Sequence, residues 1–210
     1  MPNPKVLPYM SNYTHLMDAS VPKGASGVTQ RHGWVALLLL LLSPLACATA
    51  KPGMGASVDF VDAMGREGTL GAFMGHVVVL DVCASWATAC NLNARVLDEV
   101  AIALAAQGTR DVVILTVLLD EGPLGVQALR SYGETLGVTH PVMLAGSRVR
   151  AGTSILGEAS YVPRIVIFDR LGAVRVDDSG GVLNVEGLVA RVQPLLRESV
   201  QSRAASTASP

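Results

Sequence analysis

The stretch VVVLDVCASWATAC, residues 77–90, joins a short apolar run to the start of a helical pattern. Its first half, Val77 to Cys83, is rich in β-branched residues and short enough for a buried strand. From residue 88 to 107 apolar residues recur every four positions, which predicts an amphipathic helix. The residues with this period are Leu92, Val96, Val100 and Leu104. We therefore expect a strand that leads directly into a helix, with one cysteine on each side of the junction.

Downstream, short apolar runs continue to alternate with helical patterns. Residues 112–119 (VVILTVLL) form an apolar run of the kind buried in parallel sheets, and residues 141–144 form a shorter extended piece. RIVIFDRLGAVRV, residues 164–176, predicts a hairpin around an Asp-Arg-Leu-Gly turn. Helices are expected at residues 124–136 and 185–196. This β-α-β-α-β-β-α order predicts an α/β fold, with a mixed central sheet flanked by helices.

Composition limits the function classes. The chain has 210 residues, of which 50% are hydrophobic and 16% charged, so disorder of the whole chain is excluded. Sixteen Lys and Arg against 17 Asp and Glu give a net charge of -1. Without a basic excess, nucleic acid is not expected as a partner. No glycine-rich phosphate loop or run of metal ligands is visible, so we expect no cofactor and no metal.

The N-terminal region has the parts of a secretory signal peptide. An unbroken apolar run of nine residues, 34–42, is less than half of the ~20 residues that a membrane-spanning helix needs. Arg31 and His32 precede it, and an Ala-Thr-Ala tail follows. We expect residues 1–50 to be a leader and signal peptide and the protein to be exported to the periplasm, where disulfides persist. The Ser/Ala-rich segment 198–210 is expected to be a disordered tail.

Cys47 leaves the processing of this segment open. A cysteine after an apolar run and a small residue is similar to a bacterial lipoprotein acceptor, which would anchor the N-terminus in a membrane. Pro44 and Leu45, however, occupy positions where that pattern has an aliphatic and a small residue. The alternative is cleavage after Ala48 or Ala50. In both cases Cys83 and Cys90 are the two cysteines of the domain.

Four segments together resemble the thioredoxin fold, in its TlpA-like (redoxin-type) branch of exported thiol–disulfide proteins. They are an opening at residues 58–82, the active-site loop CASWATAC at 83–90, a stretch before a core strand at 136–142, and YVPRIVIFD at 161–169. The resemblance covers residues 57–197, which are the expected domain. It implies that Pro163 follows a cis peptide bond and faces the Trp86–Cys90 loop.

The loop departs from the motif of that family. Aligning Trp86 with the family's tryptophan places Ala87 where the first, nucleophilic cysteine stands. Thr88 and Ala89 fill the two intervening positions, and Cys90 takes the place of the second cysteine. Alanine cannot form a mixed disulfide, so ordinary dithiol exchange requires chemistry that this loop lacks.

The role of the cysteines stays open. The six residues between Cys83 and Cys90 turn the chain back over the strand end, which can bring the thiols together in a structural disulfide. Alternatively, Cys83 points to the opposite face of the sheet, because side chains alternate along a strand, and Cys90 is a small buried hydrophobe. A copper site of Cys83, Cys90 and His140 has the wrong cysteine spacing, and a lone histidine is typical of a surface or loop.

Two acidic positions also have alternative interpretations. Asp81 lies inside an apolar run, where it is either a buried acid that shuttles protons to a cysteine or a hydrogen-bonded acid at a strand end. Asp120 and Glu121 follow the second apolar run and are expected to be loop charges.

Two functions remain. The resemblance with a lost nucleophile favours a non-catalytic or impaired relative that binds exported proteins or peptides in the groove beside Pro163. The alternative is an active periplasmic thiol–disulfide oxidoreductase that uses Cys90, with or without Cys83.

Overall fold

The computed structural model describes residues 57–198. The expected leader and signal peptide, the candidate lipid acceptor Cys47 and the tail beyond residue 198 lie outside the described residues. The limits of the expected domain, residues 57–197, therefore stay a prediction. Within the described range, no helix is both long and apolar enough to cross a bilayer.

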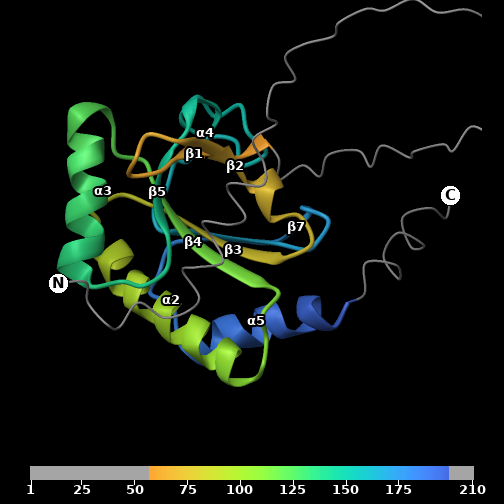
Figure 1. The fold of residues 1–210 in the computed structure, drawn as a ribbon. Helices are drawn as coiled ribbons and strands as arrows, with labels where there is room; N and C mark the ends of the chain where they lie inside the picture. Colours follow the sequence, from red (N-terminus) through yellow and green to blue (C-terminus); the bar gives the residue numbers. More distant parts are fainter. Residues whose placement is uncertain (1–56, 199–210) are drawn as a thin grey trace, which may run out of the picture.

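A mixed sheet of seven strands forms the centre of the fold, in the order β2-β1-β5-β4-β3-β6-β7 (Figure 1). The strands are β1 Asp59–Val61, β2 Glu67–Thr69, β3 Val77–Cys83, β4 Val112–Leu118, β5 Val142–Ala145, β6 Arg164–Phe168 and β7 Val174–Ser179. β3, β4 and β5 are parallel, and the outer pairs are antiparallel. The predicted strands and hairpin are thus confirmed. β1 and β2 form an additional hairpin on the β5 edge, for which the sequence pattern predicted no strands.

Helices cover both faces of the sheet. They are η2 Leu70–Phe73, α2 Thr88–Ala106, α3 Gly122–Leu136, α4 Ser147–Arg150 and α5 Val185–Arg197. The three long helices α2, α3 and α5 pack on one face, whereas η2 and α4 cover the other (Figure 1). α2 and α3 share a face because each connects one parallel strand to the next in the same direction with a right-handed crossover.

The predicted apolar face of α2 is partly wrong. Leu92 is 50% exposed, and the helix instead buries Cys90, Ala94, Leu97, Val100 and Leu104. The reason is geometric. A step of four residues exceeds one 3.6-residue turn, so the drift between Leu92 and Leu104 reaches about 120°. Spacings of three and four must be combined to keep one face buried, as they are from Cys90 to Leu104, where the steps are four, three, three and four.

Candidate functional site

The junction between β3 and α2 brings the two cysteines of the domain together. β3 ends at Cys83 and α2 begins at Thr88. Between them, the amide of Ala87 donates to the carbonyl of Ala84 at 3.1 Å and closes a turn. Cys90, in the first turn of α2, forms a disulfide with Cys83, and their Cα atoms are 5.7 Å apart. Of the two alternatives that the sequence left open, the structure therefore has the bonded pair.

Cys83 faces α2 because of its position along β3. Val77 and Val79 belong to the same core cluster as Leu97 of α2, and side chains two positions apart on a strand share a face. Cys83 continues this series, whereas Val82 packs in the core on the opposite face. The alternative orientation of Cys83 is thus wrong.

Both cysteine side chains are closed off from solvent, each being 0% exposed. Ala87, at the position of the missing nucleophile, packs in the same apolar cluster and is 9% exposed. It is the N-cap residue of α2 and makes no side-chain hydrogen bond to the helix amides. An external thiolate must reach a sulfur atom to exchange with it, so exchange at this site requires the loop to move first.

Asp81 is buried directly beside the disulfide. It is 0% exposed, and its Oδ1 and Oδ2 atoms lie 3.1 and 3.2 Å from Cys83 Sγ. Burial raises the pKa of Asp81 to about 7, and the hydrogen bond from Thr116 opposes this shift. The carboxyl group therefore carries its proton on an appreciable fraction of molecules at neutral pH. Its position beside the sulfur is the one that the proton-shuttling interpretation requires.

Thr116, His140 and Asp98 continue from Asp81 toward solvent. Thr116 is the cross-strand neighbour of Asp81, and its Oγ1 lies 3.3 Å from Asp81 Oδ2 and 3.0 Å from His140 Nε2. His140 Nδ1 lies 2.7 Å from Asp98 Oδ1. Asp98 also accepts the amides of Thr139 and His140, at 2.8 and 3.0 Å. His140 lies in the loop between α3 and β5, as one of its interpretations had it, but it is only 2% exposed, so its interpretation as a surface residue is wrong.

Asp120 fastens the loop after β3 to the end of β4. Its carboxylate accepts both the amide and the hydroxyl of Ser85. The amide of Leu119 donates to the carbonyl of Cys83 at 2.8 Å and ties the same two segments together. Asp120 is thus more than the loop charge that the sequence predicted, because it holds the loop over the disulfide.

The segment around Pro163 borders this loop. The Val162–Pro163 bond is cis, as the resemblance implied, and Val162 packs against the cluster that holds both cysteines. The carbonyl of Pro163 accepts the amide of Gly180 at 2.8 Å, which brings the turn after β7 to the same edge. Asn93 of α2 holds that turn from the other side, since its Oδ1 accepts the amide of Leu183 at 2.8 Å.

Each of these three segments exposes one large apolar side chain. Trp86 in the loop is 76% exposed, Tyr161 before the cis-proline 73%, and Val182 in the turn after β7 59%. We call these three residues the apolar rim. The contacts described above hold their segments side by side around the buried disulfide.

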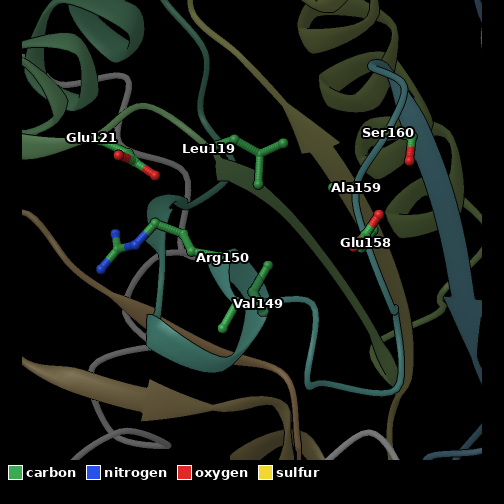
Figure 2. A pocket seen from close by; sticks show the side chains of 8 residues that line it. Leu119, Glu121, Val149, Arg150, Glu158, Ala159 and Ser160 are labelled. Atoms are coloured by element: carbon green, nitrogen blue, oxygen red, sulfur yellow. The ribbon is translucent and has the colours of Figure 1, made fainter.

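A pocket of about 350 Å³ lies next to the segment of Tyr161. Figure 2 shows Glu158 and Ser160 on one side of it and Glu121 and Arg150 on the other. Ser160 directly precedes Tyr161, so the pocket borders the apolar rim. Its lining carries charges of both signs, beside apolar side chains such as those of Leu119 and Val149 in Figure 2.

No family model matches the sequence, and no curated protein matches it. Solved structures, by contrast, are similar. A thiol:disulfide interchange protein from Chlorobium tepidum is 21% identical with a TM-score of 0.55, over 71% of this chain and 99% of that chain. A secreted disulfide oxidoreductase from Mycobacterium tuberculosis is 18% identical with a TM-score of 0.53, over 67% and 97%. The thioredoxin domain of a thiol-disulfide oxidoreductase from Bacteroides vulgatus is 16% identical with a TM-score of 0.55, over 67% and 93%.

The chain has a thioredoxin-like fold. At these identities the likeness concerns the fold, and the site must be interpreted from its own residues. In this thioredoxin-like domain, Cys83, Cys90, Ala87 and the segment of Pro163 lie together. Trp86 belongs to the same loop but points its side chain largely into solvent, and Thr88 and Ala89 form the start of α2.

The copper site considered from the sequence is not assembled. Cys83 and Cys90 are bonded to each other, and the ring nitrogens of His140 face Thr116 and Asp98. Across residues 57–198, no group of three or more His, Cys, Asp and Glu side chains is arranged to hold a metal ion.

Proposed function

We propose that this thioredoxin-like domain is an exported binding module that holds extended segments of other exported polypeptides at the apolar rim, and that it does not exchange disulfides at the rate of an active oxidoreductase. One contrast carries the proposal. Cys83 and Cys90 are 0% exposed, whereas Trp86 and Tyr161 beside them are 76% and 73% exposed. A partner that approaches this site therefore contacts an apolar surface and not a sulfur atom.

Slow exchange follows from two features of the loop. A nucleophilic cysteine at a helix N-terminus is reactive because the helix dipole and free amides stabilise its thiolate. Ala87 occupies that place here and supplies no thiol. The sulfur atoms that remain lie behind a loop that Asp120 fastens through Ser85, so a partner's thiolate meets the loop before it meets the disulfide.

Binding of polypeptide segments is favoured by the chemistry of the rim. Tryptophan and tyrosine combine a large apolar surface with a polar edge, and they are enriched among residues that contribute most to binding. Trp86 and Tyr161 are exposed on neighbouring segments, since Val162, next to Tyr161, packs against the cluster that contains Ala87. The adjoining pocket, with Arg150, Glu121 and Glu158, offers charged groups to the polar side chains and backbone of a bound segment. The signal-peptide pattern of residues 34–50 supports exported proteins as the partners.

The second candidate is an active periplasmic thiol–disulfide oxidoreductase that uses Cys90 together with Cys83. The disulfide itself favours this function, as does the buried carboxyl group of Asp81 beside Cys83 Sγ. Mixed-disulfide trapping in cells separates the two candidates. An oxidoreductase yields covalent partner adducts that disappear in Cys90→Ser, whereas the binding module yields none in either protein.

Trp86 provides a direct assay of binding, because it is the only tryptophan of residues 57–198. The mature protein is titrated with S-carboxymethylated insulin B chain, an unfolded peptide that has no tryptophan and cannot form disulfides. We expect a saturable change in Trp86 emission, and in Tyr161→Ala an affinity lower by about tenfold, the loss of ~1.4 kcal/mol typical of an interface aromatic.

The matched control for Tyr161→Ala is Ile102→Ala. Ile102 is a 57% exposed apolar residue of α2 that lies twelve positions beyond Cys90. That spacing places it about 18 Å along the helix from the site. An unchanged emission spectrum at saturating peptide would contradict the proposal, as would equal losses of affinity in the two variants.

A further inference from the structure

A chain of hydrogen-bonding groups behind the disulfide has no part in partner binding. It runs from Cys83 Sγ past Asp81, Thr116 and His140 to Asp98. Its inner end is closed, since Asp81 and the side chain of His140 are 0% exposed. Its outer end is open, since the side chain of Asp98 is 16% exposed. The chain therefore connects a buried sulfur atom with solvent through three ionisable groups and one hydroxyl.

The hydroxyl of Thr116 makes the charges on its two neighbours depend on each other. A threonine hydroxyl has one proton, so it donates to one neighbour at a time. If Thr116 donates to His140 Nε2, the ring is neutral and Asp81 supplies the proton of the other hydrogen bond. If Thr116 donates to Asp81, that carboxyl is ionised and His140 donates from Nε2. Both arrangements satisfy every contact with one mobile proton, held by Asp81 in the first and by His140 in the second.

The state of Cys83 selects between these arrangements. In the disulfide, Sγ has no proton to donate to the carboxyl oxygens of Asp81 at 3.1 and 3.2 Å. A buried carboxylate there would accept only from the Thr116 hydroxyl, so the disulfide favours the protonated carboxyl of Asp81 and a neutral His140. After reduction, the thiol of Cys83 donates to Asp81 and stabilises the carboxylate. Thr116 then turns toward Asp81, and Nε2 of His140 takes up a proton.

We propose that this chain makes His140 the proton acceptor that accompanies reduction of the disulfide, with the hydroxyl of Thr116 as the connecting group. This inference goes beyond the proposed binding function and does not depend on any partner. It requires only that a small dithiol such as dithiothreitol reduces the Cys83–Cys90 bond.

The reaction balances in electrons and protons. One thiolate of the dithiol attacks a sulfur of the disulfide, which breaks the S–S bond and forms a mixed disulfide. The second thiolate of the same dithiol then attacks this mixed disulfide, and the oxidised dithiol leaves as a cyclic disulfide. Two electrons pass to the protein, and the dithiol releases two protons. The Cys83 sulfur takes the proton of Asp81, the Cys90 sulfur takes one released proton, and His140 takes the other. Asp81 ends as a carboxylate and His140 as an imidazolium, so the net charge is unchanged.

The other ionisable groups that face the chain keep their charge in the neutral range. Tyr132 of α3 donates from its hydroxyl to the carbonyl of Cys90 at 3.0 Å. Burial raises the pKa of Tyr132 further above its usual value, and the charges of Asp81 and Asp120 add to this shift, so it stays protonated. Burial alone would raise the pKa of Asp98, but its hydrogen bonds, first the one from the His140 side chain, lower it below the usual value. Asp98 is therefore ionised and stabilises a positive charge on His140.

The test is a titration of the His140 ring nitrogens by long-range ¹H–¹⁵N NMR, from about pH 5 to pH 9, a range that spans the usual protonation of histidine. It uses the mature protein, oxidised and reduced by dithiothreitol, with His76 as an internal reference. We expect the protonation midpoint of His140 to be higher in the reduced protein than in the oxidised protein, because the neighbouring carboxylate of Asp81 favours the charged ring. Equal midpoints in the two states would overturn the proposal.

Thr116→Val keeps the shape of the side chain but removes the hydroxyl, and we expect it to make the two midpoints equal. Thr139→Val is the matched control, because it makes the same change next to His140 while the backbone amide of Thr139 still donates to Asp98. It should keep the wild-type difference. If Thr116→Val does not fold, Asp81→Asn, which cannot ionise, must abolish the difference in its place. Persistence of the difference in the folded variant would overturn the proposal.

Discussion

Ser85 donates its backbone amide and its hydroxyl to the carboxylate of Asp120, at 2.9 and 2.6 Å. The two residues are 35 positions apart, and each lies just beyond the end of a parallel strand. Their contact closes the loop between β3 and α2 over a disulfide that is itself fully buried. We therefore expect the reactivity of Cys83 and Cys90 to depend on how often this loop opens.

Asp120→Ala should accelerate reduction of the disulfide under native conditions. Hydrogen bonds to a charged group contribute about 1.5–3 kcal/mol each, and loss of ~1.4 kcal/mol from the closed loop raises the open population tenfold. We expect dithiothreitol to reduce the variant at least about tenfold faster than wild type, as measured by alkylation and mass spectrometry. Glu121→Ala, which removes the adjacent exposed acid, should react like wild type. Equal rates for Asp120→Ala and Glu121→Ala would show that the loop does not limit access.

Asp81 should make the folded domain less stable as the pH rises toward neutrality. Its pKa of about 7 lies above the ordinary value of 3.8, so between these values the folded state holds a proton that the unfolded chain has lost. The free energy of unfolding therefore falls as the pH rises through this window, by up to about 4 kcal/mol from this one group, and levels off above it.

Asp81→Asn removes this contribution, so the variant should gain stability relative to wild type between about pH 5 and pH 8. Urea denaturation of the oxidised proteins at both pH values measures the difference. The pKa values of Asp59, Asp62 and Asp177 are lowered, so these carboxylates lose their stabilising effect only at acidic pH, below this window. A difference between wild type and Asp81→Asn that stays constant with pH would contradict the buried, protonated state of Asp81.

Restoring a cysteine at position 87 should create exchange activity. In the double variant Cys83→Ala/Ala87→Cys, the new thiol lies at the N-cap of α2, where the helix dipole lowers a thiol pKa, and Cys90 has no other partner. We expect faster insulin reduction than in wild type. The single variant Ala87→Cys should gain less, because Cys83 competes for Cys90. Inactivity of a folded double variant would mean that more than the missing nucleophile has been lost.

The disulfide should contribute measurably to stability. A disulfide that closes a loop this short stabilises the folded state by about 2–3 kcal/mol, because it reduces the entropy of the unfolded chain. We expect the Cys83→Ala/Cys90→Ala variant to lose at least this amount in urea denaturation, since truncating buried side chains adds to the loss. Thiol counting in denaturant without reductant should find no free thiol in the unlipidated mature domain. Two free thiols there would contradict the bonded pair.

The fold could be predicted from the sequence because several separate features of the pattern indicated the same elements. The apolar runs of β3 and β4 are too short and too β-branched for helices, and the turn after Phe168 marks a hairpin. The face of β3 on which Cys83 lies could also have been predicted. This residue lies two and four residues beyond Asp81 and Val79, on the face that α2 covers.

The polar contacts of the site could not be predicted in the same way. His140 meets Asp98 across 42 positions, and Ser85 meets Asp120 across 35. Nothing in the local pattern of these residues identifies their partners. The first contact depends on how α2 packs beside the segment before β5, and the second on which strand ends become neighbours in the sheet. The burial of His140 follows from the same tertiary arrangement, in which Asp98 on α2 binds both its ring and its backbone amide.

Insulin reduction by dithiothreitol tests the central claim most directly, with wild-type mature protein beside Cys90→Ser and an active thioredoxin as the positive control. The buried disulfide and Ala87 predict that wild type and Cys90→Ser both stay at the uncatalysed rate. A thioredoxin-like rate in wild type that Cys90→Ser abolishes would contradict the account and identify the domain as an oxidoreductase.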